Sequence, residues 1–356
     1  MNDTFLMFKE LTEVPGAVGF ESKVKDTLHK WMEPYAHSVE SDQLGSYIAV
    51  KNGTSSGPKI MIAAHLDEVG FMVTQITKDG FLKFMPLGGW WEQVLLAQRV
   101  RVVTRTKEII GVIGSKPPHI LSTADRKKPV EIPEMFIDIG ASSKEEAEEF
   151  GVRPGDFIVP ECPFTVMENS KLMMAKSWDN RIGCAILVEV FKRLQNENHS
   201  NTVYGVATVQ EEVGLRGAQT AAHVVQPDIA FSIDVGVAKD TPGINSDIPA
   251  KIGEGPQIVL LDKSMIPHVG LRNFVIELAE KYKIPFQYES MSGGGTDAGA
   301  IHQVGNGVPS LAITIATRYI HSHASILHYD DFENSVNLFV ELIKNIDSNT
   351  LSSIKF

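Results

Sequence analysis

The sequence predicts an α/β domain that is interrupted by an inserted β domain. Strand and helix patterns alternate from Lys171 onward, whereas short strands with a single helix fill the stretch before Pro163. An apolar strand pattern at residues 59–66, which ends in the HLD segment, precedes the β-rich stretch. We therefore assign residues 1–67 and 165–356 to the α/β domain and residues 68–164 to the insertion.

Two helices are predicted near the N-terminus. Apolar residues recur at helical intervals within residues 6–11 and 24–31, and the second helix begins around Glu21 and Ser22. Short β-rich runs follow and are separated by the turn-rich segments NGTSSGP and KDG. These runs cover residues 46–50, 59–66 and 69–76.

The insertion is predicted to be a compact β module, and the remainder a sheet with helices on both faces. Within the insertion, strands are expected at residues 99–104, 109–114, 135–140 and 156–160, with one helix at residues 142–151. Beyond it, strands are expected at residues 171–176, 202–210, 228–234, 256–261 and 309–315. The helices there are expected at residues 179–194, 215–225 and 267–283, with others opening at Thr296 and near Asp331.

Composition narrows the possible partners and the compartment. A formal net charge of -11 over 356 residues argues against nucleic acid or an anionic membrane as a partner, because both would repel the average field of the protein. No apolar run approaches the roughly 18 residues of a membrane span, and the N-terminus does not resemble a signal peptide. Cys162 and Cys184 are too few for a disulfide framework. We expect a cytoplasmic protein.

Histidine and acidic residues follow several predicted strands. His65 and Asp67 end one strand, where open α/β folds bind their ligands. Side chains two apart on a strand share a face, so Asp67 can accept the imidazole proton and fix the tautomer of His65 for a metal. The alternative is a structural histidine at the end of the strand, with its hydrogen bonds made within the protein and no metal bound.

Three further acidic residues occupy comparable positions. Asp179 lies at a predicted helix start, where it either caps the helix or bridges two cations. Glu211 and Glu212 follow an apolar strand directly, and adjacent strand side chains diverge, so one can bind a metal while the other faces its water. The alternative is a solvated pair at the rim of the sheet.

Another acid and two histidines complete the set. Asp234 ends a further apolar strand, and His321 and His323 follow the last one, with a spacing that does not choose between them. Two cations require a bridging carboxylate and further nitrogen or oxygen ligands on each ion. A mixed ligand set of this kind suits zinc, cobalt or manganese better than calcium.

Six motifs in this order resemble the tetrahedral (TET) family of dinuclear metallo-aminopeptidases, which includes glutamyl and deblocking aminopeptidases. The resemblance covers nearly the whole chain and is far more specific than any single motif. The motifs are AAHLDEVG, SWDNRIG, QEEVGLRGA, DVG, SGGGTDAG and RYIHS.

The resemblance implies a role for each candidate residue. Asp179 matches the bridging ligand, and His65 and Asp234 match the other ligands of one metal ion. Glu212 and His321 match those of the second ion, with His321 preferred over His323 because it lies in the RYIHS motif.

The remaining roles also come from the resemblance. Glu211 matches the general base and Asp67 the partner of His65, and the bond between Asp179 and Asn180 is expected to be cis. Asp297, in SGGGTDAG, is expected to contact the substrate or a metal ligand; the alternative is a turn capped by Thr296. This motif lacks the GKS/T ending of a phosphate loop.

The family also implies the architecture and the activity. We expect a mixed-sheet, zinc-peptidase-like catalytic domain with a PDZ-like insertion that serves oligomer contacts, and dimers that assemble into a tetrahedral dodecamer. The expected reaction is hydrolysis of the N-terminal residue from oligopeptides with two divalent ions per subunit. Zinc or cobalt is favoured, and manganese is an alternative.

Three other interpretations are considered. A two-metal carboxypeptidase or deacylase would need a cationic clamp for the substrate carboxylate. An endoglucanase would need two acids about 5 to 9.5 Å apart across a sugar, for which neighbouring Glu211 and Glu212 are poorly placed. A metal-stabilised scaffold without activity is the third. Arg216, Lys251 and Lys263 are unranked candidates for binding an acidic substrate side chain, and His119 lies in a Pro-rich segment that either reaches a subunit contact or forms an ordinary turn.

Overall fold

A mixed eight-stranded sheet forms the centre of the larger part of the molecule. The computed structural model describes residues 3–354. The strand order is β1-β2-β12-β3-β13-β16-β14-β15, and β12, β3, β13 and β16 are mutually parallel. The strands are β1 (Ser38–Ser41), β2 (Tyr47–Lys51), β3 (Lys59–His65), β12 (Thr202–Thr208), β13 (Ile229–Val237), β14 (Gln257–Leu261), β15 (Gln287–Ser290) and β16 (Ser310–Thr317).

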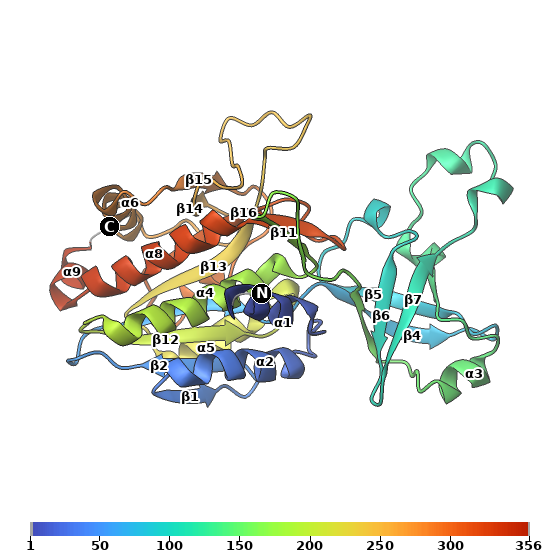
Figure 1. Ribbon diagram of the computed structural model, residues 1–356, viewed down its shortest axis with the longest axis horizontal. Helices are drawn as coiled ribbons and strands as arrows, with labels where there is room; N and C mark the ends of the chain where they lie inside the picture. Colours follow the sequence, from blue (N-terminus) through green and yellow to red (C-terminus); the bar gives the residue numbers. More distant parts are fainter. Residues whose placement is uncertain (1–2, 355–356) are drawn as a thin grey trace.

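Helices cover both faces of this sheet (Figure 1). One face packs against α1 (Asp3–Glu13), α2 (Ser22–Met32), α4 (Trp178–Arg193), α6 (Val269–Tyr282) and α8 (Tyr329–Asn345), and the other against α5 (Arg216–Val225) and α7 (Ala298–Ile301). Alternate side chains of β3 point to opposite faces, so Ile60 and Ile62 join the first cluster and Met61 and Ala63 the second. The last helix is α9 (Ser348–Ser353).

A closed barrel lies beside the sheet and has its own apolar core (Figure 1). Its strands pair in the order β4-β5-β8-β7-β6-β9, and closure leaves no unpaired edge. The core contains Phe71, Val102, Ile137 and Ile158. The barrel elements are β4 (Gly70–Ile76), β5 (Leu82–Leu87), β6 (Arg99–Val103), β7 (Glu108–Gly114), β8 (Phe136–Asp138), α3 (Lys144–Glu149) and β9 (Phe157–Pro160).

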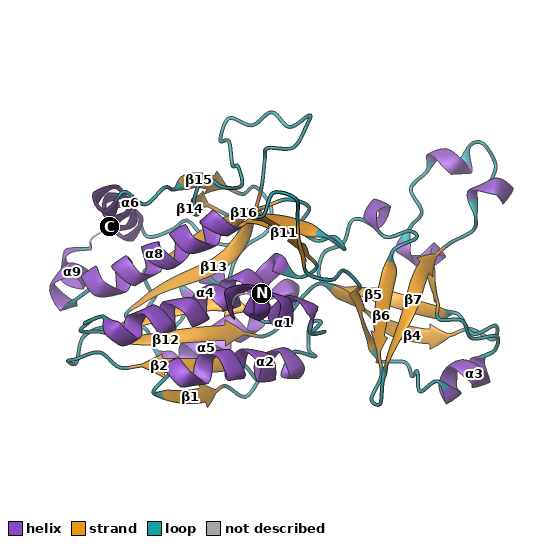
Figure 2. Ribbon diagram, in the orientation of Figure 1, coloured by secondary structure: helices purple, strands orange, loops and turns teal. Residues whose placement is uncertain are grey.

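Smaller elements complete the chain. A three-stranded sheet is formed by β10 (Thr165–Val166), β11 (Leu172–Ala175) and β17 (Ser325–His328). Figure 2 shows two long connections that extend away from the layers, one between β7 and β8 and one between β13 and β14. Short 3-10 turns lie at Glu33–Tyr35, Glu92–Val94, Pro118–Ile120, Asp125–Lys127, Ile132–Glu134, Leu194–Asn196 and Glu211–Val213.

The predicted helices and apolar strands are present, with shifted ends. The strand expected at residues 202–210 stops at Thr208, and the helix expected from Thr296 is only Ala298–Ile301. The sequence patterns missed β1 and β15, which are the two edge strands of the large sheet. An edge strand with one exposed side lacks an apolar signal, and all four residues of β1 are exposed. No helix among residues 3–354 is both long and apolar enough to span a membrane.

Trp178 joins the core to the segment that carries Asp179. Its side chain is fully buried, its Nε1 donates to the carbonyl of Met173 at 3.2 Å, and its ring meets the edge of Phe8 at 5.5 Å. The large side chain therefore belongs to the core, although it precedes a candidate metal ligand.

Replacing Trp178 with alanine should destabilise the fold strongly. Removal of a buried tryptophan leaves a cavity, and we expect the free energy of unfolding to fall by about 3–5 kcal/mol. Urea unfolding at a fixed protein concentration measures the change. Trp91→Ala is the control, because Trp91 is 60% exposed and its loss should change stability little. An equal loss in both variants would contradict the assignment of Trp178 to the core.

Candidate metal centre

The candidate residues meet at the carboxyl end of the parallel strands. His65 ends β3 and His321 follows β16, whereas Asp234, which we expected at the end of its strand, lies three residues before the last residue of β13, Val237. Asp179 enters from the start of α4, and its peptide bond to Asn180 is cis, as the resemblance implies. Segments far apart in the sequence thus converge at the carboxyl ends of the parallel strands, where open α/β folds bind ligands.

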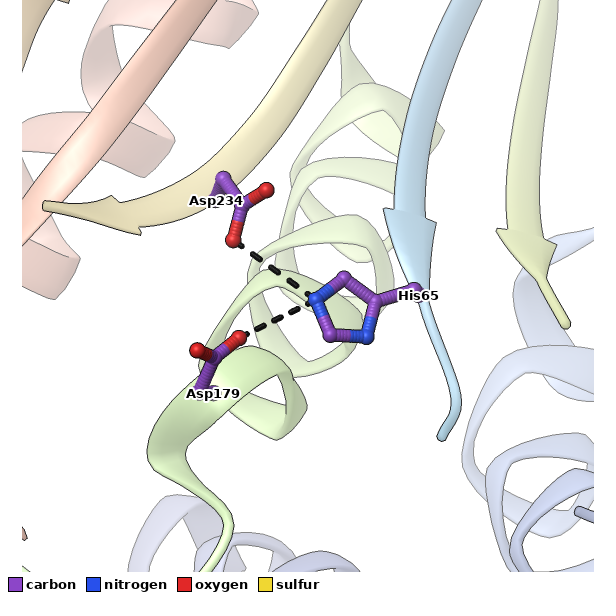
Figure 3. Close-up of side chains that lie close together, drawn as sticks. All are labelled: His65, Asp179 and Asp234. Atoms are coloured by element: carbon purple, nitrogen blue, oxygen red, sulfur yellow. Dashed lines mark ion pairs between the residues drawn. The ribbon is translucent and has the colours of Figure 1, made fainter. Parts of the chain in front are cut away.

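One cluster forms around His65. Its Nε2 lies 3.0 Å from Asp179 Oδ1 and 3.6 Å from Asp234 Oδ1, and all three side chains point toward one another (Figure 3). Glu211 Oε2 is 3.8 Å from the same nitrogen. The ligand atoms of His65, Asp179 and Asp234 all lie within 4.8 Å of one another, a spacing that can hold one metal ion.

A second cluster forms around His321. Its Nε2 lies 3.2 Å from Asp179 Oδ2 and 3.4 Å from Glu212 Oε1. The ligand atoms of these three residues also lie within 4.8 Å of one another. Asp179 therefore directs Oδ1 to one cluster and Oδ2 to the other, the arrangement of a carboxylate that bridges two cations.

The donor atoms fit divalent cations. Asp179 Oδ1 and Glu212 Oε1 are buried, and imidazole nitrogens of His65 and His321 lie 3.0 and 3.4 Å from them. Buried carboxylate oxygens are costly unless positive charge neutralises them. A set of two imidazoles and several carboxylates matches the ligands that zinc, cobalt and manganese take, so the residues present fit the expected ions.

The electrostatics of the cluster indicate a deficit of positive charge. Burial raises the pKa of Glu211 well above its usual value, and burial likewise raises the pKa of Asp234. Burial disfavours the charged form of His321, yet Asp179 and Glu212 outweigh it and raise the pKa of this histidine to about 11. Bound cations would relieve the repulsion among these carboxylates.

Asp67 holds the turn that carries the two glutamates. Its carboxylate accepts the backbone N–H of Glu211 at 3.0 Å and of Glu212 at 3.1 Å. The His65 Nδ1 atom lies closer to the Asp67 carbonyl oxygen, at 3.0 Å, than to the carboxylate, at 3.7 Å. The backbone carbonyl of Asp67 thus orients His65. The Asp67 carboxylate, which we expected in this role, instead holds the turn that carries Glu211 and Glu212.

The two glutamates lie on a turn, whereas from the sequence we expected them at the end of a strand. β12 ends at Thr208, and Glu211 and Glu212 belong to the 3-10 turn that follows. Gln210 precedes them in a left-handed conformation with φ of 56°, and its N–H donates to Glu21 Oε1 at 3.1 Å. Divergence of the two side chains therefore comes from a turn that buried carboxylates hold in place.

The remaining candidates differ in their relation to the site. Asp297 is 2% exposed and does not line the cleft above the ligands; its Oδ2 accepts the Thr208 hydroxyl at 2.6 Å, and burial raises its pKa to about 7. Asp297 thus lies outside the lining of the cleft, and its expected contact with the substrate or with a metal ligand stays a prediction. His323 lies outside the candidate metal clusters, and burial lowers its pKa to about 4.

Two glycines near the site were not anticipated from the sequence. Gly88 and Gly89 follow β5 in the barrel and approach the ligands of the second cluster. A Cβ on Gly88 would lie 3.3 Å from Glu212 and 2.7 Å from Val69, and one on Gly89 would lie 3.3 Å from His321 Nδ1. The GGWW string was the available signal, but only the close approach gives it a meaning.

A cleft of about 880 Å³ opens above the ligands. Its wall includes Lys239, Lys263 and Ser264, together with the glycine-rich segment that precedes Thr296. Lys239 pairs with Glu289 at 2.7 Å. Of the three cations considered for substrate recognition, only Lys263 lines this cleft; Arg216 and Lys251 lie outside its lining.

Residues 45–338 match the model of the M42 glutamyl aminopeptidase family. The chain belongs to this family. It is 38% identical to a glutamyl aminopeptidase of Lactococcus lactis over 99% of both chains. The structure matches that of a TET aminopeptidase from a marine sediment Thaumarchaeota archaeon with a TM-score of 0.97 and 51% identity, again over 99% of both chains.

A third relative is the TET1 peptidase of Pyrococcus horikoshii, which can assemble into a tetrahedron or a large octahedral shell. The match has a TM-score of 0.87 and 34% identity, and it covers 97% of this chain and 100% of that one. Family membership makes the present chain an aminopeptidase and favours none of the three other interpretations. It also confirms the mixed α/β fold expected from the sequence.

Substitution of Gly88 by alanine should weaken binding of one metal ion. The added Cβ would press on Glu212 and Val69, and loss of support around a metal ligand typically lowers metal affinity about 10–100-fold. Metal content per chain after dialysis against graded metal buffers measures this effect.

Gly155→Ala is the matched control for this prediction. Gly155 also has positive φ, of 96°, but a Cβ there meets nothing within 4 Å. Backbone strain is therefore common to both variants, and contact with the ligand is specific to Gly88→Ala. Equal metal loss in the two variants would show that strain alone is responsible.

Proposed function

We propose that this aminopeptidase removes the N-terminal residue of oligopeptides with two divalent ions, which His65 and Asp234 hold on one side and Glu212 and His321 on the other. The observation that supports this most directly is the orientation of Asp179, whose two carboxylate oxygens face the two histidines at 3.0 and 3.2 Å. Zinc or cobalt is the favoured metal, with manganese as the alternative, because the ligand set combines imidazole nitrogen with carboxylate oxygen.

When bound, such a metal pair lowers the pKa of a water molecule toward about 7 and polarises the scissile carbonyl. The chain supplies the proton transfer. Glu211 lines the cleft and is 8% exposed, and the assigned ligand set is complete without it. Its carboxylate first accepts the proton of the attacking water and then returns it to the leaving amine.

The surrounding residues keep Glu211 in position for that transfer. Asp67 holds the N–H groups of residues 211 and 212, so the base and the neighbouring ligand share one anchor. A proton carrier must lie within hydrogen-bond reach of the atoms it serves. A rigid turn maintains that geometry through the cycle.

We also propose the division of the chain into a catalytic domain of residues 1–67 and 165–356 and an inserted domain of residues 68–164. The separate apolar cores of the large sheet and the barrel support this division. In this proposal the insertion is a PDZ-like domain that serves contacts between copies, and the copies assemble as dimers into a tetrahedral dodecamer in the cytoplasm. The reported assembly of the Pyrococcus horikoshii relative supports the oligomer.

Glu211→Gln should lower turnover strongly and keep both metal ions. Loss of the proton carrier is expected to lower kcat by about 10²–10⁴-fold on an aminoacyl amide. Glu212→Gln is the matched neighbour, and it should lose part of the metal as well as activity. Metal analysis and steady-state kinetics on the same preparations separate the two. Near-normal turnover of a fully loaded Glu211→Gln enzyme would refute the assignment.

Removal of the ions should lower both activity and stability. A ligand that binds only the folded state at 100 times its Kd contributes about 2.7 kcal/mol, so chelation should lower the Tm measurably. Readdition of zinc, cobalt or manganese should restore both properties. If neither activity nor Tm changed on chelation or on readdition of metal, a metal-dependent site would be excluded.

A further inference from the structure

A second hollow, of about 750 Å³, adjoins the metal centre on the side of the barrel. One wall comes from the barrel segment between β5 and β6, and the other from the segment between β16 and β17. We call it the barrel groove. Gly89, Ile320 and His321 line both the barrel groove and the cleft above the metal ligands, so the two spaces meet at a candidate ligand.

The barrel groove exposes large apolar side chains. Trp91 is 60% exposed, Tyr319 56% and Leu96 37%, and all three line it. The preceding Trp90 is held differently: its ring stacks on Phe71 at 4.7 Å and its Nε1 donates to the Gly70 carbonyl at 3.0 Å. Trp90 therefore anchors this wall to the barrel core, and Trp91 remains available for a ligand. Aromatic side chains gathered in this way mark binding surfaces.

A buried histidine in the same groove lacks hydrogen bonds. His323 is 5% exposed, its ring lies 5.7 Å from that of Trp90, and neither ring nitrogen has a hydrogen-bond partner among residues 3–354. An imidazole offers donors and an acceptor, and a buried polar group without partners is unfavourable. Both ring nitrogens are enclosed by the protein, so the ring forms part of the wall of the groove beside Trp90.

The two spaces are lined by different kinds of residue. The cleft is lined by the candidate metal ligands together with Lys263, Ser264 and the glycine-rich segment 292–295. The lining of the barrel groove includes the exposed side chains of Trp91, Leu96 and Tyr319. Removal of one residue from a long peptide needs a space for that residue and an adjoining space for the rest, and these two spaces adjoin at His321.

We propose that the barrel groove binds the part of the peptide that follows the scissile bond, and that it favours apolar side chains in the first two positions after that bond. The proposal rests on the proposed metal centre, because that centre places the scissile bond between the two spaces. The apolar wall supplies affinity by excluding water from the substrate side chains. Contacts with peptide groups orient the chain.

The test compares two substrates that share an N-terminal residue. That residue is the one that gives the highest rate in a screen of aminoacyl amides. One substrate is the aminoacyl amide, and the other is a pentapeptide with leucine at its second and third positions. The measured quantity is the ratio of kcat/KM for the pentapeptide to kcat/KM for the amide. In the parent enzyme this ratio should exceed that of a pentapeptide with glycine at both positions.

Trp91→Ala should lower this ratio at least tenfold, chiefly through KM for the pentapeptide, and Leu96→Ser should lower it in the same direction. Tyr282→Ala is the control, because Tyr282 is 40% exposed at the end of α6 and lines neither space. It should leave the ratio unchanged. Light scattering on each variant records the assembly state.

Two results would overturn the proposal. One is an unchanged ratio in both groove variants. The other is a parallel loss on both substrates together with a change in assembly, which would assign the groove to a contact between copies of the chain. Failure of the Glu211 assignment leaves the test readable, since the ratio compares two substrates on one enzyme and needs no particular proton carrier.

Discussion

Repulsion among buried carboxylates is the constraint on which the site depends. Asp179, Glu211, Glu212 and Asp234 line one cleft with side chains that are only 6–13% exposed, and charges of one sign in such a place are unfavourable without compensation. Two histidines contribute part of that compensation, and the proposed ions contribute the rest. The backbone must therefore hold the acids in place before any ion binds, and the described structure shows how it does so.

The segment after Asp179 is fixed by buried polar contacts. Asn180 Nδ2 donates to the Ile233 carbonyl at 2.7 Å, which ties the start of α4 to the strand that carries Asp234. Arg181 donates to the carbonyls of Leu66 at 2.8 Å and Leu11 at 2.6 Å. The same guanidinium and Lys176 both contact the Glu68 carboxylate, one residue beyond Asp67. The DNR string is thus a structural clamp around the bridging ligand as well as a family motif.

Residue patterns predicted more of the fold than of the site. Apolar periodicity located the central strands and the long helices, because those elements bury their faces in two large clusters. It did not reveal the turn at Gln210 or the hydrogen bonds from backbone N–H groups to the Asp67 carboxylate. Both depend on contacts between segments that are far apart in the sequence: Asp67 and Glu211, for example, are separated by 144 residues. The choice of His321 over His323 came from the family motif, and the structure brings only His321 to Asp179 and Glu212.

The barrel connects the insertion to the candidate metal centre. Its glycine pair approaches two candidate metal ligands closely, and of the next two residues Trp90 packs on the barrel core and Trp91 lines the barrel groove. A displacement of the barrel would therefore change the surroundings of Glu212 and His321 and the shape of the barrel groove at the same time. Because Gly88 and Gly89 have no side chains, the barrel approaches Glu212 and His321 closely without covering them. Contacts that hold the barrel in an assembly would by the same route hold the active site.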